Sequence, residues 1–134
     1  MTEIVRSGTH TLVGKDCIQV IWSGLDGDDS GMAMEFSGYP DKTAQVLGTF
    51  DSGTCKIYGS NDPAVLTDRA AGTLFGSKTA EWILAQDSLG NDFSKTAAGG
   101  DVLLDDYRYY LPVVTGGGGS TSLKVIIKAG RASK

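Results

Sequence analysis

Residues 45–62, QVLGTFDSGTCKIYGSND, decide the fold class because they combine two strand-like runs with two turns. The runs cover residues 43–50 and 54–58, and Asp51-Ser52-Gly53 lies between them. A three-residue connection that ends in Gly is typical of a β-hairpin in which this Gly takes a positive φ. The second run is followed by Gly59-Ser60-Asn61-Asp62, four turn-forming residues that end the strand. The stretch therefore predicts an antiparallel hairpin.

The whole chain of 134 residues shows the same alternation of short strands and turns. Its 19 Gly are about twice the usual share of roughly 7%. Eight or so strand-like runs recur at regular spacing, with no convincing long helix. In the run at residues 122–129, Leu123, Val125 and Ile127 share one side, which should be buried, and Lys128 lies on the other. In the run at residues 18–25, Gln19 lies on the side opposite the buried one. This pattern predicts an all-β fold, an antiparallel β-sandwich of jelly-roll type. We expect residues 1–16 to form an N-terminal arm or edge strand and residues 17–134 to form the sandwich.

Three local features refine this expectation. Residues 63–79 predict a long surface loop, with room for a short helix after Pro63. Pro112 lacks an N–H group, so its strand should be an edge or carry a bulge there. In the run Tyr107-Arg108-Tyr109-Tyr110, alternate side chains share a face. We expect one face of this run to be core and the other to be exposed.

The charge pattern excludes some classes of partner. A net charge of -4 argues against a general nucleic-acid binder, which would carry a basic face. The basic run at residues 124–134 is better explained as a solvated strand face and tail than as a docking site for an acidic surface. No apolar run approaches the length that crosses a bilayer, and the first residues do not form a signal peptide. We therefore expect synthesis in a cytoplasm and no membrane partner.

Catalytic and metal-binding patterns are absent from the sequence. His10 is the single histidine, and it lies in a Ser/Thr/Gly-rich segment. Cys17 and Cys55 are too few for a disulfide scaffold, and we expect reduced, buried thiols unless their strands face each other closely. One His and two distant Cys do not form a zinc site. The tetraglycine that begins at Gly116 lacks the Lys and helix of a phosphate-binding loop. We expect no enzyme activity, no cofactor and no metal.

The acidic loop with Asp26, Asp28 and Asp29 has a composition that could hold a calcium ion or form a tight turn. Clustered carboxylates suit Ca²⁺, but the twelfth position of an EF-hand loop would be Ser37 rather than an acidic residue. Asp and Gly are also the ordinary residues of tight turns. The turn is the favoured interpretation.

A set of turns and core positions between Trp22 and Ile127 resembles small virion structural proteins of tailed bacteriophages. The family pattern comprises a Gly-Thr-Phe hairpin, a Gly-Ser-Asn-Asp turn, a Trp strand, an Asp-x-x-Gly-Asn turn and an Arg-Tyr-x-x-Pro strand. The segments that carry the resemblance are Trp22-Ser-Gly-Leu25, Gly27–Gly31, Tyr39–Lys42, Gln45–Phe50, Thr54–Asp62, Trp82, Gln86–Asn91, Tyr107–Pro112 and the final Leu123-x-Val125-x-Ile127 strand. The chain departs from the pattern at residues 63–80, which separate the Gly-Ser-Asn-Asp turn from the Trp strand.

The resemblance implies a place on the virion, at the capsid surface, as a head decoration or cement protein. The implied partner is the phage major capsid protein, with self-association into a dimer or trimer on the capsid lattice. The arm and the loop after Pro63 are the expected contact regions, through Ile4, Val5, Arg6, His10, Leu66, Arg69, Leu74 and Phe75. Two alternatives stay open: a carbohydrate- or ligand-binding β-sandwich, and a structural protein of the tail or connector.

Overall fold

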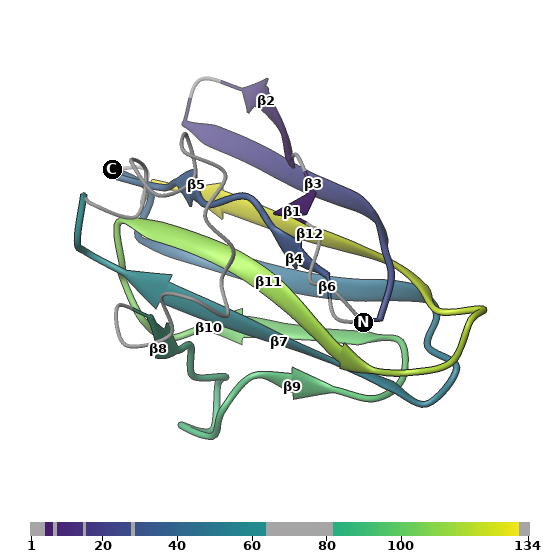
Figure 1. The fold of residues 1–134 in the computed structure, drawn as a ribbon. Helices are drawn as coiled ribbons and strands as arrows, with labels where there is room; N and C mark the ends of the chain where they lie inside the picture. The colour runs from purple at the N-terminus through teal and green to yellow at the C-terminus, as the bar shows by residue number, and fades with distance from the viewer. Residues whose placement is uncertain (1–4, 7, 15, 28, 64–81, 132–134) are drawn as a thin grey trace.

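The computed structural model describes residues 5–6, 8–14, 16–27, 29–63 and 82–131, and the regular structure within these ranges is all β. Two sheets pack face to face as a sandwich (Figure 1), which confirms the predicted fold class. None of the described residues forms a helix that could span a bilayer. The predicted loop at residues 63–79 lies, from residue 64 onward, outside the described residues.

The five-stranded sheet has the strand order β10-β6-β12-β3-β2, and every neighbouring pair is antiparallel. Its strands are β2 (Gly8–Gly14), β3 (Cys17–Leu25), β6 (Asp41–Thr49), β10 (Gly99–Leu103) and β12 (Ser122–Gly130). Alternate residues of β12 are buried, as the sequence predicted, including Leu123, Val125 and Ile127. The period of two fixes which side chains face the second sheet and which face outward.

The seven-stranded sheet has the order β1-β4-β11-β7-β8, with β5 also paired to β11 and β9 also paired to β7. Its strands are β1 (Val5–Arg6), β4 (Ser30–Gly31), β5 (Met34–Glu35), β7 (Gly53–Ser60), β8 (Ile83–Leu84), β9 (Ser94–Lys95) and β11 (Tyr109–Gly116). The β1–β4 pair is parallel, and the other pairs are antiparallel.

The strand order defines a jelly roll. The short strands β4 and β5 lie end to end along β11, and β8 and β9 lie end to end along β7, so each pair occupies one position. From β3 onward the chain then fills eight positions, arranged as first-eighth-third-sixth in one sheet and second-seventh-fourth-fifth in the other. This is the connectivity of two Greek keys folded over each other.

The hairpin between β6 and β7 is tighter than predicted. The residues with positive φ are Asp51 (44°) and Ser52 (68°), and the N–H group of Gly53 donates to the carbonyl of Phe50 at 2.6 Å. The connection is therefore a two-residue loop of type I′ character, and the expected positive φ at Gly53 is wrong. Gly53 is needed for another reason, because a Cβ there would lie 2.9 Å from the Phe50 oxygen.

Strand β11 is buried on both faces, so the expectation of one exposed aromatic face is wrong. Tyr110 and Val114 point between the sheets, into the main core. Tyr109, Leu111 and Val113 point outward and form a second buried cluster, with Ala33 and Trp82. The neighbouring Tyr107 precedes the strand and packs edge-on against the Tyr110 ring, with centroids 6.0 Å apart.

Pro112 lies inside the seven-stranded sheet, between β7 and the β4/β5 side, so an edge position is also wrong. On one side of Pro112, Val113 pairs with Ser30 of β4. On the other side, Tyr110 pairs with Met34 of β5. The missing N–H group thus faces the interruption between these two short strands. A sheet tolerates proline there because no ladder hydrogen bond is lost.

The N-terminal segment lies along one edge of the sandwich (Figure 1). Its first strand, β1, pairs with β4 in the seven-stranded sheet, and its second, β2, pairs with β3 in the five-stranded sheet. Gly8, at the start of β2, lies close to Trp22. The Trp22 side chain is fully buried, and its Nε1 donates to the Met32 carbonyl at 2.9 Å.

Candidate functional site: the outer face of the five-stranded sheet

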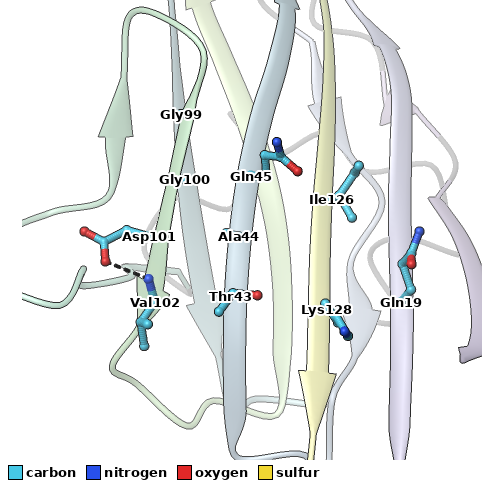
Figure 2. Close-up of a pocket in the computed structure, with 10 residues that line it drawn as sticks. All are labelled: Gln19, Thr43, Ala44, Gln45, Gly99, Gly100, Asp101, Val102, Ile126 and Lys128. Carbon is cyan, nitrogen blue, oxygen red and sulfur yellow. Dashed lines mark hydrogen bonds between the residues drawn. The ribbon is translucent and has the colours of Figure 1, made fainter. Parts of the chain in front are cut away.

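Two adjoining hollows lie on the outer face of the five-stranded sheet, with volumes of about 580 Å³ and 540 Å³. Both are lined by Thr43, Val102 and Lys128. Because they share these residues, they form one trough that crosses β10, β6 and β12 and reaches β3. Figure 2 shows the first of the two hollows.

The alternation of each strand places the side chains of this trough. Thr43 and Gln45 are exposed positions of β6, between buried neighbours. Lys128 of β12 and Gln19 of β3 occupy the matching outward positions on the next two strands, and Figure 2 shows them side by side. The side chains of the trough therefore follow from the alternation along each strand, in which one residue faces the core and the next faces outward.

The edge of the trough at β10 is shaped by glycine. A Cβ at Gly100 would lie 2.7 Å from the Ala44 carbonyl oxygen, so only glycine allows this close approach of β10 to β6. Beside it, the Asp101 carboxylate accepts the N–H group of Val102 at 2.7 Å (Figure 2). A hydrogen bond from Ser88 is the largest cause that lowers the pKa of Asp101, and the Val102 N–H group adds to it.

The chemistry of the trough is that of hydrogen-bonded recognition. It offers the amides of Gln19 and Gln45, the hydroxyl of Thr43 and the ammonium group of Lys128, beside an apolar surface that includes Val102 and Ile126. Groups of this kind fix the orientation of a bound surface or ligand. Within the described residues, no three His, Cys, Asp or Glu side chains lie close enough together to hold a metal ion.

A buried lysine closes the end of the second hollow. The side chain of Lys42 is fully buried, and its ammonium group donates to the carbonyls of Tyr39 (3.1 Å) and Pro40 (3.2 Å) and to the Asp106 carboxylate (3.2 Å). It also lies 5.2 Å from the centre of the Tyr110 ring. Desolvation lowers the pKa of Lys42, and Asp106 opposes this shift. The contacts tie the turn before β6 to the segment before β11.

The contact residues expected from the sequence lie mainly outside this face. Ile4, Leu66, Arg69, Leu74 and Phe75 are outside the described residues. Val5 and Arg6 form β1, but their side chains are not described. His10 is exposed in the middle of β2, opposite Val20 of β3. The structure thus places one of the eight expected side chains, at the edge of the five-stranded sheet.

The acidic loop is a turn in which carboxylates bind backbone donors. Asp29 is buried, and its Oδ2 accepts the N–H group of Asp26 at 2.8 Å. Asp26 in turn accepts the N–H group of Gly27 at 2.7 Å. These contacts agree with the turn interpretation; Asp28 lies outside the described residues.

The two cysteines are free and lie in different sheets. Cys17 is half-buried at the start of β3 and lines the second hollow. Cys55 is fully buried in β7, and its burial raises the pKa of the thiol to about 12.

Sequence reasoning assigned Gln19 and Lys128 to the correct strand faces but did not identify a site. The signal was present in the alternation of β3, β6 and β12. The trough itself depends on which strands are neighbours and on the close approach of β10 at Gly100, and neither can be deduced from local pattern.

No family model and no curated protein matches the chain. Among solved structures, a cupin domain from Bordetella pertussis Tohama I is similar over 99% of each chain, with 9% sequence identity and a TM-score of 0.46.

Proposed function

We propose that this chain is a structural protein of a tailed-bacteriophage virion that decorates the outer head surface. It binds the major capsid protein and stabilises the contacts between capsomers. The observation that carries the proposal is the trough on the outer face of the five-stranded sheet, whose mixed polar and apolar lining suits attachment to another protein surface. The resemblance of its turns and core positions to small virion proteins, between Trp22 and Ile127, supports the same role.

The chemistry of the trough agrees with lattice attachment. Interfaces that are not obligate are about as polar as ordinary protein surface, and they carry many hydrogen bonds. The neutral amides of Gln19 and Gln45 and the hydroxyl of Thr43 provide such bonds without a large desolvation cost. Many equivalent sites on a capsid then multiply a modest affinity at each one.

The test is occupancy on purified heads. The wild-type protein should co-sediment with heads, and its density should lie over capsomer contacts in an image reconstruction. Lys128→Glu, within the trough, should lower occupancy roughly tenfold, as expected for a lost charge contact of 1.4 kcal/mol. Lys56→Glu, on a half-buried position of β7 in the other sheet, is the matched control and should bind normally. Absence of the wild-type protein from virions and heads would refute the proposal.

The N-terminal segment is the second proposed contact region, through His10. Deletion of residues 2–9 would also remove β1 and Gly8, which belong to the fold. A point change is therefore cleaner: His10→Glu should lower occupancy on heads while the stability of the free protein stays the same. Unchanged occupancy would remove this part of the arm from the contact.

A carbohydrate-binding sandwich is the second candidate function. The observation in its favour is the lining of the first hollow by two amides and a hydroxyl, which can bond to sugar hydroxyl groups. The test is a glycan array, in the absence of heads. Binding by the wild-type protein that is lost in Gln45→Ala would favour this function over attachment to a capsid.

A further inference from the structure

Strand β2 forms the longest free edge among the strands that the structure describes. It has seven residues and lies outside β3 at the end of the five-stranded sheet (Figure 1). The strands along both sides of the seven-stranded sheet, β1, β5, β8 and β9, have two residues each. Short edges of this kind offer little for another chain to pair with.

The opposite edge of the five-stranded sheet, β10, is protected by a charged side chain and by a backbone contact next to the strand. The Val102 N–H group is bound by the Asp101 carboxylate at 2.7 Å. Just beyond the strand, the Leu104 N–H group donates to the Gln86 carbonyl at 3.0 Å. A charge within an edge strand and an occupied donor are two of the devices that prevent edge-to-edge pairing.

Strand β2 lacks these devices. Its sequence, GTHTLVG, contains no Lys, Arg, Asp, Glu or Pro. From Thr9 to Gly14 every residue is exposed, and the apolar side chains of Leu12 and Val13 are 68% and 49% exposed. Its one irregularity is a register shift at the far end, between Leu12 and Gly14. A long, uncharged and partly apolar edge is the type that recruits another strand.

We propose that β2 pairs antiparallel with β2 of a second copy of this chain and joins the two five-stranded sheets into one. A second copy is favoured over other partners because a two-fold pair forms a closed assembly. Each copy has one unprotected long edge among the described strands, so a two-fold dimer uses both edges and leaves none for further growth. The dimer goes beyond the proposed head-decoration role and does not depend on it.

The strand is also complementary to itself. Pairing about a two-fold axis at Thr11 places Thr11 opposite its own copy, His10 opposite Leu12 and Thr9 opposite Val13. Thr–Thr pairs and pairs that cover an apolar side chain stabilise antiparallel strands. The absence of charge on β2 avoids repulsion at this contact, although each chain carries a net charge of -4.

The first test is the mass of the protein in solution, measured by light scattering over a wide range of concentrations. The wild type should be a dimer, and Thr11→Lys, which sets two ammonium groups opposite each other, should weaken dimerisation roughly tenfold or more. Thr49→Lys is the matched control: the same change at an exposed position of the inner strand β6 should leave the dimer intact. A monomeric wild type, or a dimeric Thr11→Lys variant, overturns the proposal.

Cross-linking tests the register. In a Cys17→Ser background, Thr11→Cys should form a disulfide-linked dimer on oxidation, because residues directly opposite in an antiparallel pair are within reach of a disulfide. Thr49→Cys in the same background should stay monomeric on a non-reducing gel. Equal cross-linking of the two variants overturns the pairing at Thr11.

Hydrogen exchange of the wild type covers the case in which Thr11→Lys does not fold. The amides of residues 9–13 should exchange more slowly as the protein concentration rises, while those of β10 should not change. No dependence on concentration overturns the proposal. The wild-type protein could also be monomeric in solution and have these amides protected only when it is bound to heads. That result would assign the β2 edge to a strand of the capsid protein, and it also overturns the dimer proposal.

Discussion

Gly8 lies against the indole ring of Trp22, and a Cβ at Gly8 would fall 2.8 Å from Trp22 Nε1. A Cβ at Gly31 of β4 would fall 2.7 Å from the same nitrogen. The indole thus lies close to both β2 and β4. The N-terminal segment joins the sandwich at this place, because β2 pairs with β3 and β1 pairs with β4. Because Gly8 and Gly31 have no Cβ, the N-terminal segment and β4 can lie close to the buried indole.

Gly8→Ala should therefore lower the free energy of unfolding by about 1–3 kcal/mol, because the buried indole has no room to move away from a methyl group. Urea unfolding, followed by circular dichroism, measures the effect. Gly14→Ala, in the same strand, is the matched control: a Cβ there meets no atom within 4 Å, and the change should stay within about 0.5 kcal/mol. Equal effects of the two substitutions would contradict the close contact with Trp22.

The turn between β6 and β7 stores backbone strain that a substitution can relieve. Ser52 has a φ of 68°, in the left-handed region where a Cβ costs roughly 1 kcal/mol. Ser52→Gly should raise the free energy of unfolding by about 0.5–1 kcal/mol. Gly53→Ala should lower it, by about 1–3 kcal/mol, since its Cβ would crowd the Phe50 carbonyl. If Ser52→Gly brings no gain in urea unfolding, the two-residue loop is wrong.

Much of the sandwich could be predicted from the sequence because the period of two is a local property. The alternation at β12 identified its buried residues, including Leu123 and Val125, before any sheet was known. The hairpin at residues 43–58 was also located, although the positive φ values fall on Asp51 and Ser52. A Gly in a turn signals either a positive φ or a close approach, and sequence alone does not distinguish these two needs.

The environment of β11 could not be predicted, because alternation shows which side chains share a face but not what covers it. Tyr109 and Tyr110 point in opposite directions, and both are buried. Pro112 is likewise inside the sheet, since the neighbouring strand is interrupted opposite it. The trough and the free edge of β2 depend on strand order, which arises from contacts between residues far apart in the chain.

The buried thiol of Cys55 makes stability depend on pH in the alkaline range. Its pKa rises from 9.0 to about 12 on folding, so above pH 9 the unfolded chain loses a proton that the native state keeps. The native state then binds more protons than the unfolded state, and stability falls as pH rises, by up to about 1.4 kcal/mol per unit. The contribution is fully present below pH 9 and is lost between pH 9 and 12.

Other groups also titrate there, so the measurement is a difference between variants. From pH 9 to 11 the wild type should lose ~2.5 kcal/mol relative to Cys55→Ala, judged by urea unfolding at each pH. Cys17→Ala, which removes the half-buried thiol, should show the same decrease in the free energy of unfolding over this pH range as the wild type. Parallel pH curves for the wild type and Cys55→Ala would show that the Cys55 thiol does not govern this range.

Lys42 is expected to stabilise the end of the sandwich through hydrogen bonds rather than through its ion pair. Its ammonium group binds two backbone carbonyls, of Tyr39 and Pro40, and the one carboxylate it binds, on Asp106, is 64% exposed. An ion pair with an exposed carboxylate contributes little to the free energy of unfolding. A buried carbonyl that loses its hydrogen-bond donor lowers this free energy by about 1–3 kcal/mol. Lys42→Met keeps the apolar stem and removes these bonds together with the positive charge near the Tyr110 ring.

Lys42→Met should therefore lower the free energy of unfolding by about 2–4 kcal/mol, and Asp106→Asn by less, because an amide oxygen still accepts from the ammonium group. Lys124→Met, at an exposed position of β12 on the same sheet, is the control for the loss of a lysine charge and should change stability by under about 0.5 kcal/mol. Urea unfolding of the three variants ranks them. If Asp106→Asn costs as much as Lys42→Met, the ion pair, and not the backbone carbonyls, is what holds this lysine in the core.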